Sequence, residues 1–325
     1  MTMAIRIHEP GGPEKMVWEA VDVPDPGPRD VRLRQTAVGL NFIDVYMRSG
    51  LYPLSSMPVV LGLEAAGVVE AIGEGVTDLA VGDRVAYAGG PPGAYAESRI
   101  LVAKECVRLP DAISDEQGAA MMLQGMTAAA LLRRTFAVKP GDTILMHAAA
   151  GGVGLIVCQW AKALGATVIG TVGSDEKAAL AQAHGCDHTI VYTRENFTER
   201  TRELTGGRGV DVVYDSIGQD TFFGSLDSLR RLGTMVTFGN ASGPVKPFAP
   251  LELTKRGSLT LVRPTLFHYT TTREELLGLA TELFDMVLAG KLKIEVNQRY
   301  PLAEAALAHQ DLEGRKTTGS TVLTV

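Results

Sequence analysis

The sequence predicts an α/β protein of two domains, one rich in short β-strands and one built on a doubly wound parallel sheet. Three observations lead to this prediction. The chain of 325 residues is longer than a typical single domain. Residues 1 to about 120 consist of short apolar runs separated by glycine and proline. After residue 124, strand-like and helix-like segments alternate, which is typical of parallel strands joined by helical crossovers.

In the first region, turn residues separate short strands frequently, which predicts a barrel-like β domain. A helix is predicted over 41–48, and another begins at Ser114, where Gln117 completes a capping box and 127–134 continues helical. Turn residues such as those of 24–28 separate the apolar runs. Strands are predicted at 3–7, 31–37, 66–72, 84–88 and 94–101.

The stretch 142–177 is predicted to form one strand–helix–strand unit. An apolar strand at 143–147 precedes a helix that ends near Leu164, and 167–172 is the next strand. Between them, Ala149-x-Gly151-x-x-Gly154 matches the dinucleotide fingerprint, with alanine in the first position. Small residues there permit a tight turn and bring the N–H groups of a helix N-terminus close to a pyrophosphate. A dinucleotide site is therefore predicted, and the alternative is a purely structural turn.

The alternation continues to residue 263, and a long helix follows at 272–289, ended by Gly290. The tail, 293–325, contains strand, short helix and strand and is assigned to the first domain. The predicted domains are thus 1–123 with 266–325, and 124–265. Within the second domain, helices are predicted at 176–184, 196–204 and 222–230, and strands at 189–192, 210–215, 233–239 and 259–263.

Composition and charge exclude several classes of protein. A hydrophobic content of 46% supports large cores, and a net charge of −6 argues against nucleic-acid or anionic-membrane binding. No apolar run reaches the length of a membrane span, and the N-terminus shows no signal sequence, so we expect a cytoplasmic protein. The three cysteines lie too far apart for a disulfide framework or a C-x-x-C motif: Cys106, Cys158 and Cys186.

A zinc site is not predicted. Zinc needs three or four Cys, His, Asp or Glu ligands at suitable spacing. None of the six histidines forms an H-x-x-H motif or pairs with a cysteine: His8, His147, His184, His188, His268 and His309. A structural role is expected for each.

The end of the strand at 167–172 predicts the cofactor. An acid there would bind the ribose of NAD, but this chain has Gly173-Ser174. Lys177 lies one helical turn further, and Tyr192 ends the next strand on the adenine side, which together favour NADPH. The alternative is that Lys177 is a solvated surface lysine. Asp175 and Glu176 weaken the NADPH prediction, although helix N-termini attract acids for structural reasons.

The chain contains four recognisable motifs: Gly39-Leu40-Asn41-Phe42-Ile43-Asp44, Gly62-Leu63-Glu64-Ala65-Ala66-Gly67, Val81-Gly82-Asp83-Arg84-Val85 and Ala149-Ala150-Gly151-Gly152-Val153-Gly154. Together they resemble the medium-chain dehydrogenase/reductase superfamily, in its zinc-free quinone oxidoreductase branch, over essentially the whole chain. Zinc-dependent relatives carry cysteine at the position of Asn41, histidine at that of Leu63 and a third ligand near Gln124. They also insert a four-cysteine lobe where this chain has only 89–93.

The resemblance implies a GroES-like barrel and a Rossmann domain, with NADPH in the cleft between them and direct hydride transfer to a quinone. It also implies a homodimer, in which we expect the edge strand near 257–263 to pair with its copy. The catalytic residues carried over are Asn41, Asp44, Tyr46, Tyr52 and Arg263. The cofactor contacts are Asn41, Gln124, Thr127, Ala150, Gly151, Gly152, Val153, Gly173, Ser174, Lys177, Tyr192, Ser216, Phe238, Gly239, Asn240, Arg263 and Arg315.

Alternatives remain open at this point. The same hydride geometry would serve an NADPH-dependent alkenal or enone reductase. A non-enzymatic NADPH-binding protein, RNA-binding or structural, is a further alternative, although the acidic charge argues against RNA. Tyr46 and Tyr52 could be barrel packing only. Close relatives carry tyrosine just after the position of Thr127, where this chain has Ala128, Ala129 and Ala130, so a wider acceptor pocket is expected.

Overall fold

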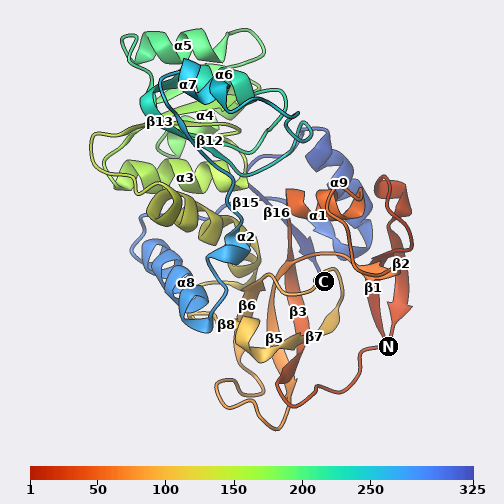
Figure 1. Cartoon of the computed structure of the whole chain (residues 1–325). Coiled ribbons are helices and arrows are strands. Elements are labelled where there is room, and N and C mark those ends of the chain that lie inside the picture. The colour runs from red at the N-terminus through yellow and green to blue at the C-terminus, as the bar shows by residue number, and fades with distance from the viewer. The chain divides into compact units, whose positions relative to one another are not determined.

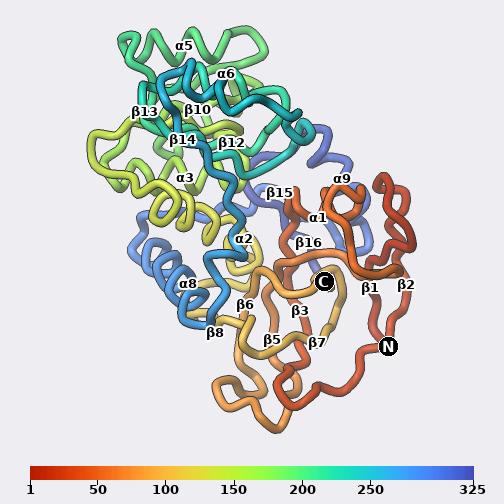
Figure 2. Tube along the Cα trace, viewed as in Figure 1, coloured from red at the N-terminus to blue at the C-terminus, as the bar shows by residue number.

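The computed structural model describes residues 1–325, and the chain divides into two compact units. Unit 1 comprises 1–124, 270–288 and 294–325, and unit 2 comprises 125–269 and 289–293. The tube in Figure 2 shows that both termini lie in unit 1. None of the helices combines the length and the apolar character needed to cross a bilayer.

Unit 1 is built on β-strands around one apolar core, and all of its strand pairs are antiparallel except β15 with β16. The strand β3 (Asp30–Leu40) is its centre, because it pairs with β5 on one side and with β7 and β16 on the other. A three-stranded sheet has the order β2-β1-β4, and a seven-stranded sheet has the order β15-β16-β3-β5-β6-β8 with β7 beside β3. The remaining strands are β1 (Thr2–Ile7), β2 (Val17–Val21), β4 (Val59–Val60), β5 (Glu64–Ile72), β6 (Arg84–Ala88), β7 (Ser98–Val102), β8 (Val107–Arg108), β15 (Val296–Pro301) and β16 (Ser320–Thr324).

Four helices complete this part of the chain: α1 (Phe42–Arg48), α2 (Asp115–Ala130), α8 (Arg273–Leu288) and α9 (Ala305–Glu313). The predicted capping box of α2 is present, since Gln117 N donates to Ser114 Oγ at 3.2 Å and Ser114 N to Gln117 Oε1 at 3.1 Å. The boundary between the units falls inside α2, which continues into a π-helical turn at Leu131–Thr135.

Unit 2 contains a six-stranded sheet in which all neighbouring strands are parallel. Its order, β11-β10-β9-β12-β13-β14, reverses direction between β9 and β12, and ligands bind beyond the carboxyl ends of strands at such a switch. The predicted α/β fold class is confirmed. The strands are β9 (Thr143–Met146), β10 (Thr167–Val172), β11 (His188–Val191), β12 (Val210–Asp215), β13 (Leu229–Thr237) and β14 (Thr260–Val262).

The crossover helices cover both faces of this sheet: α3 lies on one face, and α5 and α6 lie on the other (Figure 1). The strand β14 is the edge that the sequence predicted for 257–263. The helices are α3 (Gly152–Ala163), α4 (Asp175–Ala183), α5 (Phe197–Leu204), α6 (Phe222–Ser228) and the short α7 (Leu251–Lys255).

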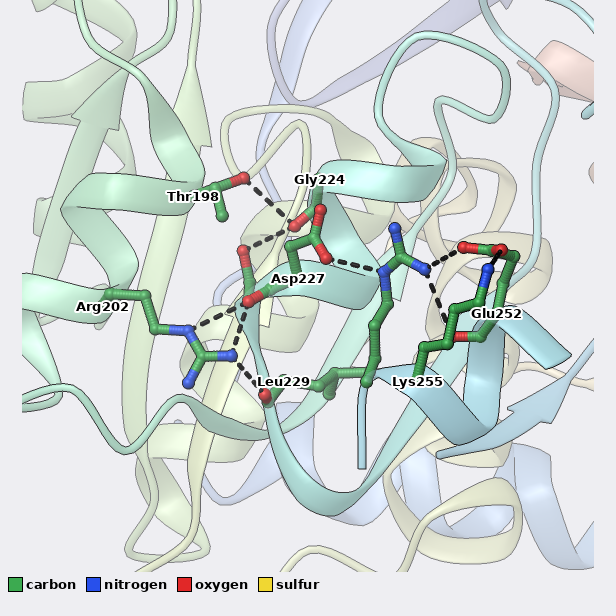
Figure 3. Close-up of polar contacts among 9 residues, drawn as sticks. Thr198, Arg202, Gly224, Asp227, Leu229, Glu252 and Lys255 are labelled. Carbon is green, nitrogen blue, oxygen red and sulfur yellow. Dashed lines mark hydrogen bonds and ion pairs between the residues drawn. The ribbon is translucent and has the colours of Figure 1, made fainter. Parts of the chain in front are cut away.

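Hydrogen bonds from arginine side chains tie α5, α6 and α7 together (Figure 3). Arg202 on α5 donates to the backbone carbonyls of Asp227 and Leu229, at 2.6 Å and 2.8 Å from Nη2. These carbonyls lie at the end of α6, where the helix itself offers no partner. Arg256 donates from Nε to the Asp227 carboxylate at 2.6 Å and also contacts Glu252. The helices α5, α6 and α7 are therefore held together by side-chain hydrogen bonds as well as by apolar packing.

One predicted strand is wrong in its first half. The sequence predicted a strand over 94–101, but β7 begins at Ser98. The preceding residues instead bridge two other segments, because Ile5 N donates to Tyr95 O at 2.8 Å and Tyr95 N to Leu61 O at 2.8 Å. The sequence also gave no expectation for β2, β4, β8 and α7, which are short or belong to the edges of their sheets.

Candidate cofactor and acceptor site

The predicted fingerprint loop follows β9 at the switch point and is folded tightly. Ala148 has a positive φ of 52°, and Gly151 is the N-cap of α3. A Cβ on Gly154 would lie 2.3 Å from Ala148 O, so only glycine fits there without a backbone shift. Ala149 N donates to Thr171 O at 3.1 Å, which joins the loop to β10. The free N–H groups at the start of α3 are thus held in the geometry that suits a pyrophosphate.

A buried row of polar side chains lies directly beneath this loop. Ser225 Oγ donates to Asp215 Oδ2 at 2.8 Å, so His147 Nε2–H donates to Ser225 Oγ at 2.9 Å. The other ring nitrogen, Nδ1, accepts from Thr171 Oγ1 at 2.9 Å. Burial lowers the pKa of His147, although the charge of Asp215 opposes the shift. His147 is therefore a neutral structural residue, and the row anchors the residue that precedes Ala148.

The three residues predicted for the adenosine 2′-phosphate, Ser174, Lys177 and Tyr192, follow the neighbouring strands β10 and β11. Ser174 is the N-cap of α4, and its Oγ accepts from Lys177 N at 3.3 Å. A Cβ on Gly173 would lie 3.0 Å from the Tyr192 hydroxyl, so that hydroxyl lies over the glycine. Tyr192 N donates to Val172 O at 3.1 Å, which fixes the tyrosine beside the end of β10.

Arg194 is a charged neighbour that the sequence did not identify. Its Nη1 donates to Asp175 Oδ2 at 2.8 Å, and its Nη2 contacts Oδ1, which makes the pair bidentate. The hydrogen bond from Arg194 lowers the pKa of Asp175. The arginine offsets the charge of Asp175, one of the two acids that weakened the NADPH prediction, whereas the other, Glu176, is hydrogen-bonded to the Ser174 side chain. No local pattern could have revealed the arginine, because Asp175 begins α4 and Arg194 follows β11.

The residues predicted after β12 and β13 also converge. A Cβ on Gly239 would lie 2.3 Å from Ser216 O, so these two turns pack backbone against backbone. Phe238 N donates to Asp215 O at 2.7 Å. Arg263, which follows β14, donates from Nη1 to Thr237 O at 3.0 Å. The structure thus brings the predicted residues Ser216, Phe238, Gly239, Asn240 and Arg263 to the carboxyl edge of the sheet.

In unit 1, Asn41 is the centre of a second buried row. Asn41 Nδ2 donates to Glu64 Oε2 at 2.6 Å, and Asn41 Oδ1 accepts from Gln124 Nε2 at 3.2 Å. The row ends at Ser320, whose Oγ donates to Gln124 Oε1 at 2.8 Å. Asn41 and Gln124 were predicted, whereas Glu64 and Ser320 were not. The register of the sheet supplies them, because β5 and β16 flank the end of β3: Gly39 pairs with Glu64, and Leu40 with Thr321.

Asp44 is fully buried and caps the helix that begins after Asn41. Its Oδ2 accepts from Asn41 N at 2.9 Å and from the Tyr95 hydroxyl at 3.0 Å, whereas its Oδ1 has no hydrogen-bond partner. Burial raises the pKa of Asp44 to about 7, against the hydrogen bonds from Asn41 and Tyr95. The buried carboxyl group therefore caps the start of α1 and holds the backbone of Asn41 in place.

A chain of hydrogen bonds connects Asp44 through Tyr95 and His309 to Arg48. The Tyr95 hydroxyl lies 3.0 Å from His309 Nε2, and Arg48 Nη1 lies 3.0 Å from His309 Nδ1. Since an arginine side chain only donates, Nδ1 accepts and Nε2–H donates to Tyr95. Burial and the charge of Arg48 lower the pKa of His309 to about 3. The hydrogen bonds therefore run from Arg48, which can only donate, to the carboxylate of Asp44, which accepts.

Tyr46 and Tyr52 form an aromatic pair with ring centroids 5.2 Å apart and planes tilted by 60°. Tyr46 is buried and Tyr52 is half-buried. Of the remaining predicted residues, Thr127 lies half-buried on α2 in unit 2, and Arg315 follows α9 in unit 1 with a φ of 58°. Ala128, Ala129 and Ala130 are all buried within α2.

Nowhere do three or more His, Cys, Asp or Glu side chains come together in a way that could hold a metal ion. At the two positions where zinc-dependent relatives would place a thiolate and an imidazole, this chain offers the Asn41 amide and the apolar Leu63. The donor chemistry at these positions does not suit zinc.

Two protein-family models match the chain. The model for the alcohol dehydrogenase GroES-like domain matches residues 27–111, and the model for zinc-binding dehydrogenases matches 152–282. The first lies within the antiparallel unit and the second begins at α3, so the GroES-like and Rossmann-type parts of the prediction are confirmed.

Similar proteins cover nearly the whole chain. A quinone oxidoreductase of Pseudomonas aeruginosa is 54% identical over 323 residues, which is 99% of each chain. A 2-haloacrylate reductase of a Burkholderia species is 51% identical over 329 residues, again 99% of each. The crystal structure of the Escherichia coli quinone oxidoreductase in complex with NADPH matches with a TM-score of 0.98 and 48% identity, over 99% of this chain and 100% of that one. The chain therefore belongs to the quinone oxidoreductase family of the medium-chain dehydrogenase/reductase superfamily.

Proposed function

We propose that this chain is an NADPH-dependent quinone oxidoreductase that transfers hydride directly to a quinone without a bound metal. The observation that supports this most is the cluster at the ends of β10 and β11. It offers Ser174, Lys177 and Tyr192 to a phosphate, and one of its two neighbouring acids, Asp175, is paired with Arg194. A related protein of known structure was crystallised with NADPH at 48% identity.

The chain's own residues fit this cofactor. A Cβ on Gly154 would meet Ala148 O at 2.3 Å, and a Cβ on Gly173 would crowd the Tyr192 hydroxyl, so both glycines allow the fingerprint loop and the tyrosine to pack closely. We infer that Ala150, Gly151, Gly152 and Val153 bind the pyrophosphate and that Ser174, Lys177 and Tyr192 bind the 2′-phosphate. The further contacts are Asn41, Gln124, Thr127, Gly173, Ser216, Phe238, Gly239, Asn240, Arg263 and Arg315.

When bound, NADPH supplies the hydride, and the protein supplies orientation and electrostatics. Asn41, Tyr46, Tyr52 and Arg263 are the donors we assign to the acceptor oxygen, which gains negative charge as hydride arrives. Asp44 acts through Asn41, whose backbone N–H it accepts. One hydride and one proton convert a quinone to a hydroquinone, and solvent can provide the proton.

Cofactor binding tests the assignment of the phosphate cluster. We expect Lys177→Ala to weaken NADPH by about ten- to a hundredfold and NADH hardly at all, since a charge-assisted hydrogen bond contributes roughly 1.5–3 kcal/mol. Ser174→Asp should go further, because it places a carboxylate against the phosphate, and aspartate still caps α4. The measurement is the Kd of both cofactors by fluorescence titration.

Lys139→Ala is the matched control, because Lys139 is an exposed lysine before the amino end of β9. Equal affinity of the wild type for NADH and NADPH would refute the assignment. So would equal weakening of both cofactors in the two site variants.

The alternative activity is reduction of a conjugated C=C bond, and the 51% identity to a 2-haloacrylate reductase favours it as the second candidate. NADPH oxidation over a panel of quinones, enones and alkenals, after dialysis against a chelator, separates the two. A quinone reductase should give its highest kcat/KM with a quinone. Higher values with an alkenal or enone would support the C=C reductase, and no turnover at all would support a non-enzymatic NADPH-binding protein.

We further propose a cytoplasmic homodimer in which two copies of β14 pair across a two-fold axis. The strand lies at the edge of its sheet and is partly exposed, which leaves a row of backbone groups available for a second copy. A dimer that dissociates in a Thr260→Pro variant, by sedimentation at micromolar concentration, is expected. We also propose domain boundaries at 123/124 and 265/266.

A further inference from the structure

The buried row in unit 1 has a direction along its whole length. Glu64 accepts hydrogen bonds from Leu123 N to Oε1 at 2.7 Å and from Asn41 Nδ2 to Oε2 at 2.6 Å, and the backbone of Met122 also donates to it. Because the Asn41 amide nitrogen donates to Glu64, its Oδ1 faces Gln124 and accepts from Nε2. The Oε1 of Gln124 then accepts from the hydroxyl of Ser320. Each amide can offer only its oxygen to a donor and only its nitrogen to an acceptor. The protonation state of Glu64 therefore determines which partner donates in every hydrogen bond of the row.

We propose that Glu64 is a positioning residue that sets the direction of this row and thereby decides which end of the Asn41 amide keeps a free N–H. The inference rests on the proposed function, in which Asn41 donates to the hydride acceptor. With Glu64 ionised, the second N–H of Asn41 lies at the end of the amide nearest Glu64. If the row reverses, that N–H moves to the end nearest Gln124, and an oxygen takes its former place.

The structure contains what a reversal needs. Protonated Glu64 would donate to Asn41 Oδ1, Asn41 Nδ2 would donate to Gln124 Oε1, and Gln124 Nε2 would donate to Ser320 Oγ. Ser320 then needs another acceptor for its proton, and Ala120 O lies 3.0 Å from its Oγ. Leu123 N–H keeps Oε1 as an acceptor, so the proton belongs on Oε2, which faces Asn41. Two amide rotations and one hydroxyl rotation suffice, without movement of the backbone.

The surroundings of Glu64 make a change of protonation accessible. Burial raises the pKa of Glu64 to about 8, the hydrogen bonds from Asn41 and Leu123 oppose the shift, and the charge of Asp44 adds to it. The ionisable neighbours that interact with Glu64 are Asp44 on α1, Tyr87 on β6 and Tyr95. Both directions of the row are therefore populated between neutral and mildly alkaline pH.

The variant Glu64→Gln keeps the size and packing of the side chain but cannot ionise, so it tests whether Glu64 sets the direction of the row. Leu123 N–H requires an oxygen at one end of the new amide, so its nitrogen must face Asn41 and donate to Oδ1. The variant thus holds the row in the reversed direction at every pH. Glu116→Gln is the matched control, because Glu116 is an exposed carboxylate of the same unit, paired with Arg299.

The first measurement is the single-turnover rate of NADPH oxidation by a benzoquinone between pH 6.5 and 9.5. In the wild type and in Glu116→Gln we expect the rate to rise through the ionisation of Glu64, and any change that Asp44 causes to come at lower pH. In Glu64→Gln we expect the more alkaline ionisation to be lost and the rate to be at least about tenfold lower at the alkaline end, since removal of one oriented donor costs about 10²–10³ in kcat. An unchanged ionisation in Glu64→Gln overturns the proposal.

The second measurement needs neither a variant nor turnover. In protein labelled with ¹⁵N at asparagine and glutamine, the side-chain amide signals of Asn41 and Gln124 should shift together with pH, with the midpoint of the rate profile. Signals that stay constant with pH overturn the proposal even if the enzyme is active. Signals that titrate in a protein without quinone turnover support the directed row and refute only the proposed function.

Discussion

The two units each bury a carboxylate beside predicted site residues, but they satisfy it differently. In unit 2, Asp215 accepts four hydrogen bonds, from Ile217 N at 2.8 Å, Gly218 N at 3.0 Å, Thr221 Oγ1 at 2.7 Å and Ser225 Oγ at 2.8 Å. In unit 1, Asp44 accepts two through one oxygen, and its other oxygen has none. Donors that point at a carboxylate favour its charged form, and burial without enough of them favours the neutral form.

The difference separates a fully hydrogen-bonded carboxylate from two carboxyl groups whose burial raises their pKa. Burial raises the pKa of Asp44 to about 7 and that of Glu64 to about 8. Asp215, with both oxygens occupied, instead holds Ser225 and through it His147, at the base of the fingerprint loop. The fingerprint loop is thus supported by a carboxylate with hydrogen bonds to both oxygens, whereas Asn41 is held by groups whose charge depends on pH.

The largest effect expected from this comparison is the loss of the anchor. Asp215→Ala leaves four donors without their partner, and we expect it to lower the free energy of unfolding of unit 2 by about 3–5 kcal/mol. Urea unfolding should be followed by the fluorescence of Trp160 in a Trp18→Phe background, because Trp160 is the tryptophan of unit 2. Asp220→Ala, an exposed neighbour, is the control. A loss below about 1 kcal/mol would show that backbone and hydroxyl donors find other partners.

The second prediction concerns the pH dependence of unit 1. The folded pKa values of Asp44 and Glu64 lie above their ordinary values of 3.8 and 4.5. Their contribution to stability is therefore complete below their ordinary pKa values, and it is lost progressively as the pH rises from those values to the folded ones of about 7 and about 8. We expect the unfolding free energy of unit 1 to fall over this range by at most about 1.4 kcal/mol per pH unit for each group.

Hydrogen exchange of peptides from β3 and β5, corrected for intrinsic rates, measures this dependence. Glu64→Gln should remove the part of the slope that belongs to Glu64, and Glu116→Gln should leave it intact. A stability that rises with pH in this range would contradict the raised pKa values of both carboxyl groups.

Local patterns predicted much of this molecule, because their signals lie within a few residues. The strand at 167–172 and the strand at 210–215 lie where the sequence placed them, and Asn41 caps α1 at the start of the helix predicted over 41–48. In each case, apolar runs, a glycine or a capping residue mark the element directly. The fingerprint was recognisable for the same reason.

The residues that the sequence missed depend on pairing between distant segments. Glu64 meets Asn41 through the register of β5 against β3, and Ser320 arrives from the last strand of the chain. His309 reaches Tyr95 from α9 in the same way. A buried polar residue in an apolar strand carries no local sign of its partner. Burial and direction of hydrogen bonds become visible only when the fold is known.

The third prediction uses the alanines of α2, where the sequence led us to expect a wider acceptor pocket. Ala129 is fully buried, so a tyrosine there has to displace its neighbours. We expect Ala129→Tyr to destabilise unit 2 by about 1–3 kcal/mol and to lower kcat/KM for all quinones by a similar factor. Ala129→Gly is the control without added volume. A loss confined to large quinones would instead show that this position narrows the acceptor pocket.

The smallest loss of unfolding free energy should come from removing a charge at the surface, and it provides a comparison with the buried carboxylates. Arg256 bridges Asp227 and Glu252 between α6 and α7, and its guanidinium lies 5.5 Å from the ring centroid of Phe223. These partners remain open to solvent and salt, so Arg256→Ala should cost only about 0.5–1 kcal/mol. In 1 M salt, where the Debye length is about 3 Å, the ionic part of that cost should shrink, whereas the cost of Asp215→Ala should persist. The same Trp160 assay in low and high salt makes the comparison. If both variants lost their effect in salt, the carboxylate of Asp215 would be as exposed to screening as a surface charge, and its role as a buried anchor would be wrong.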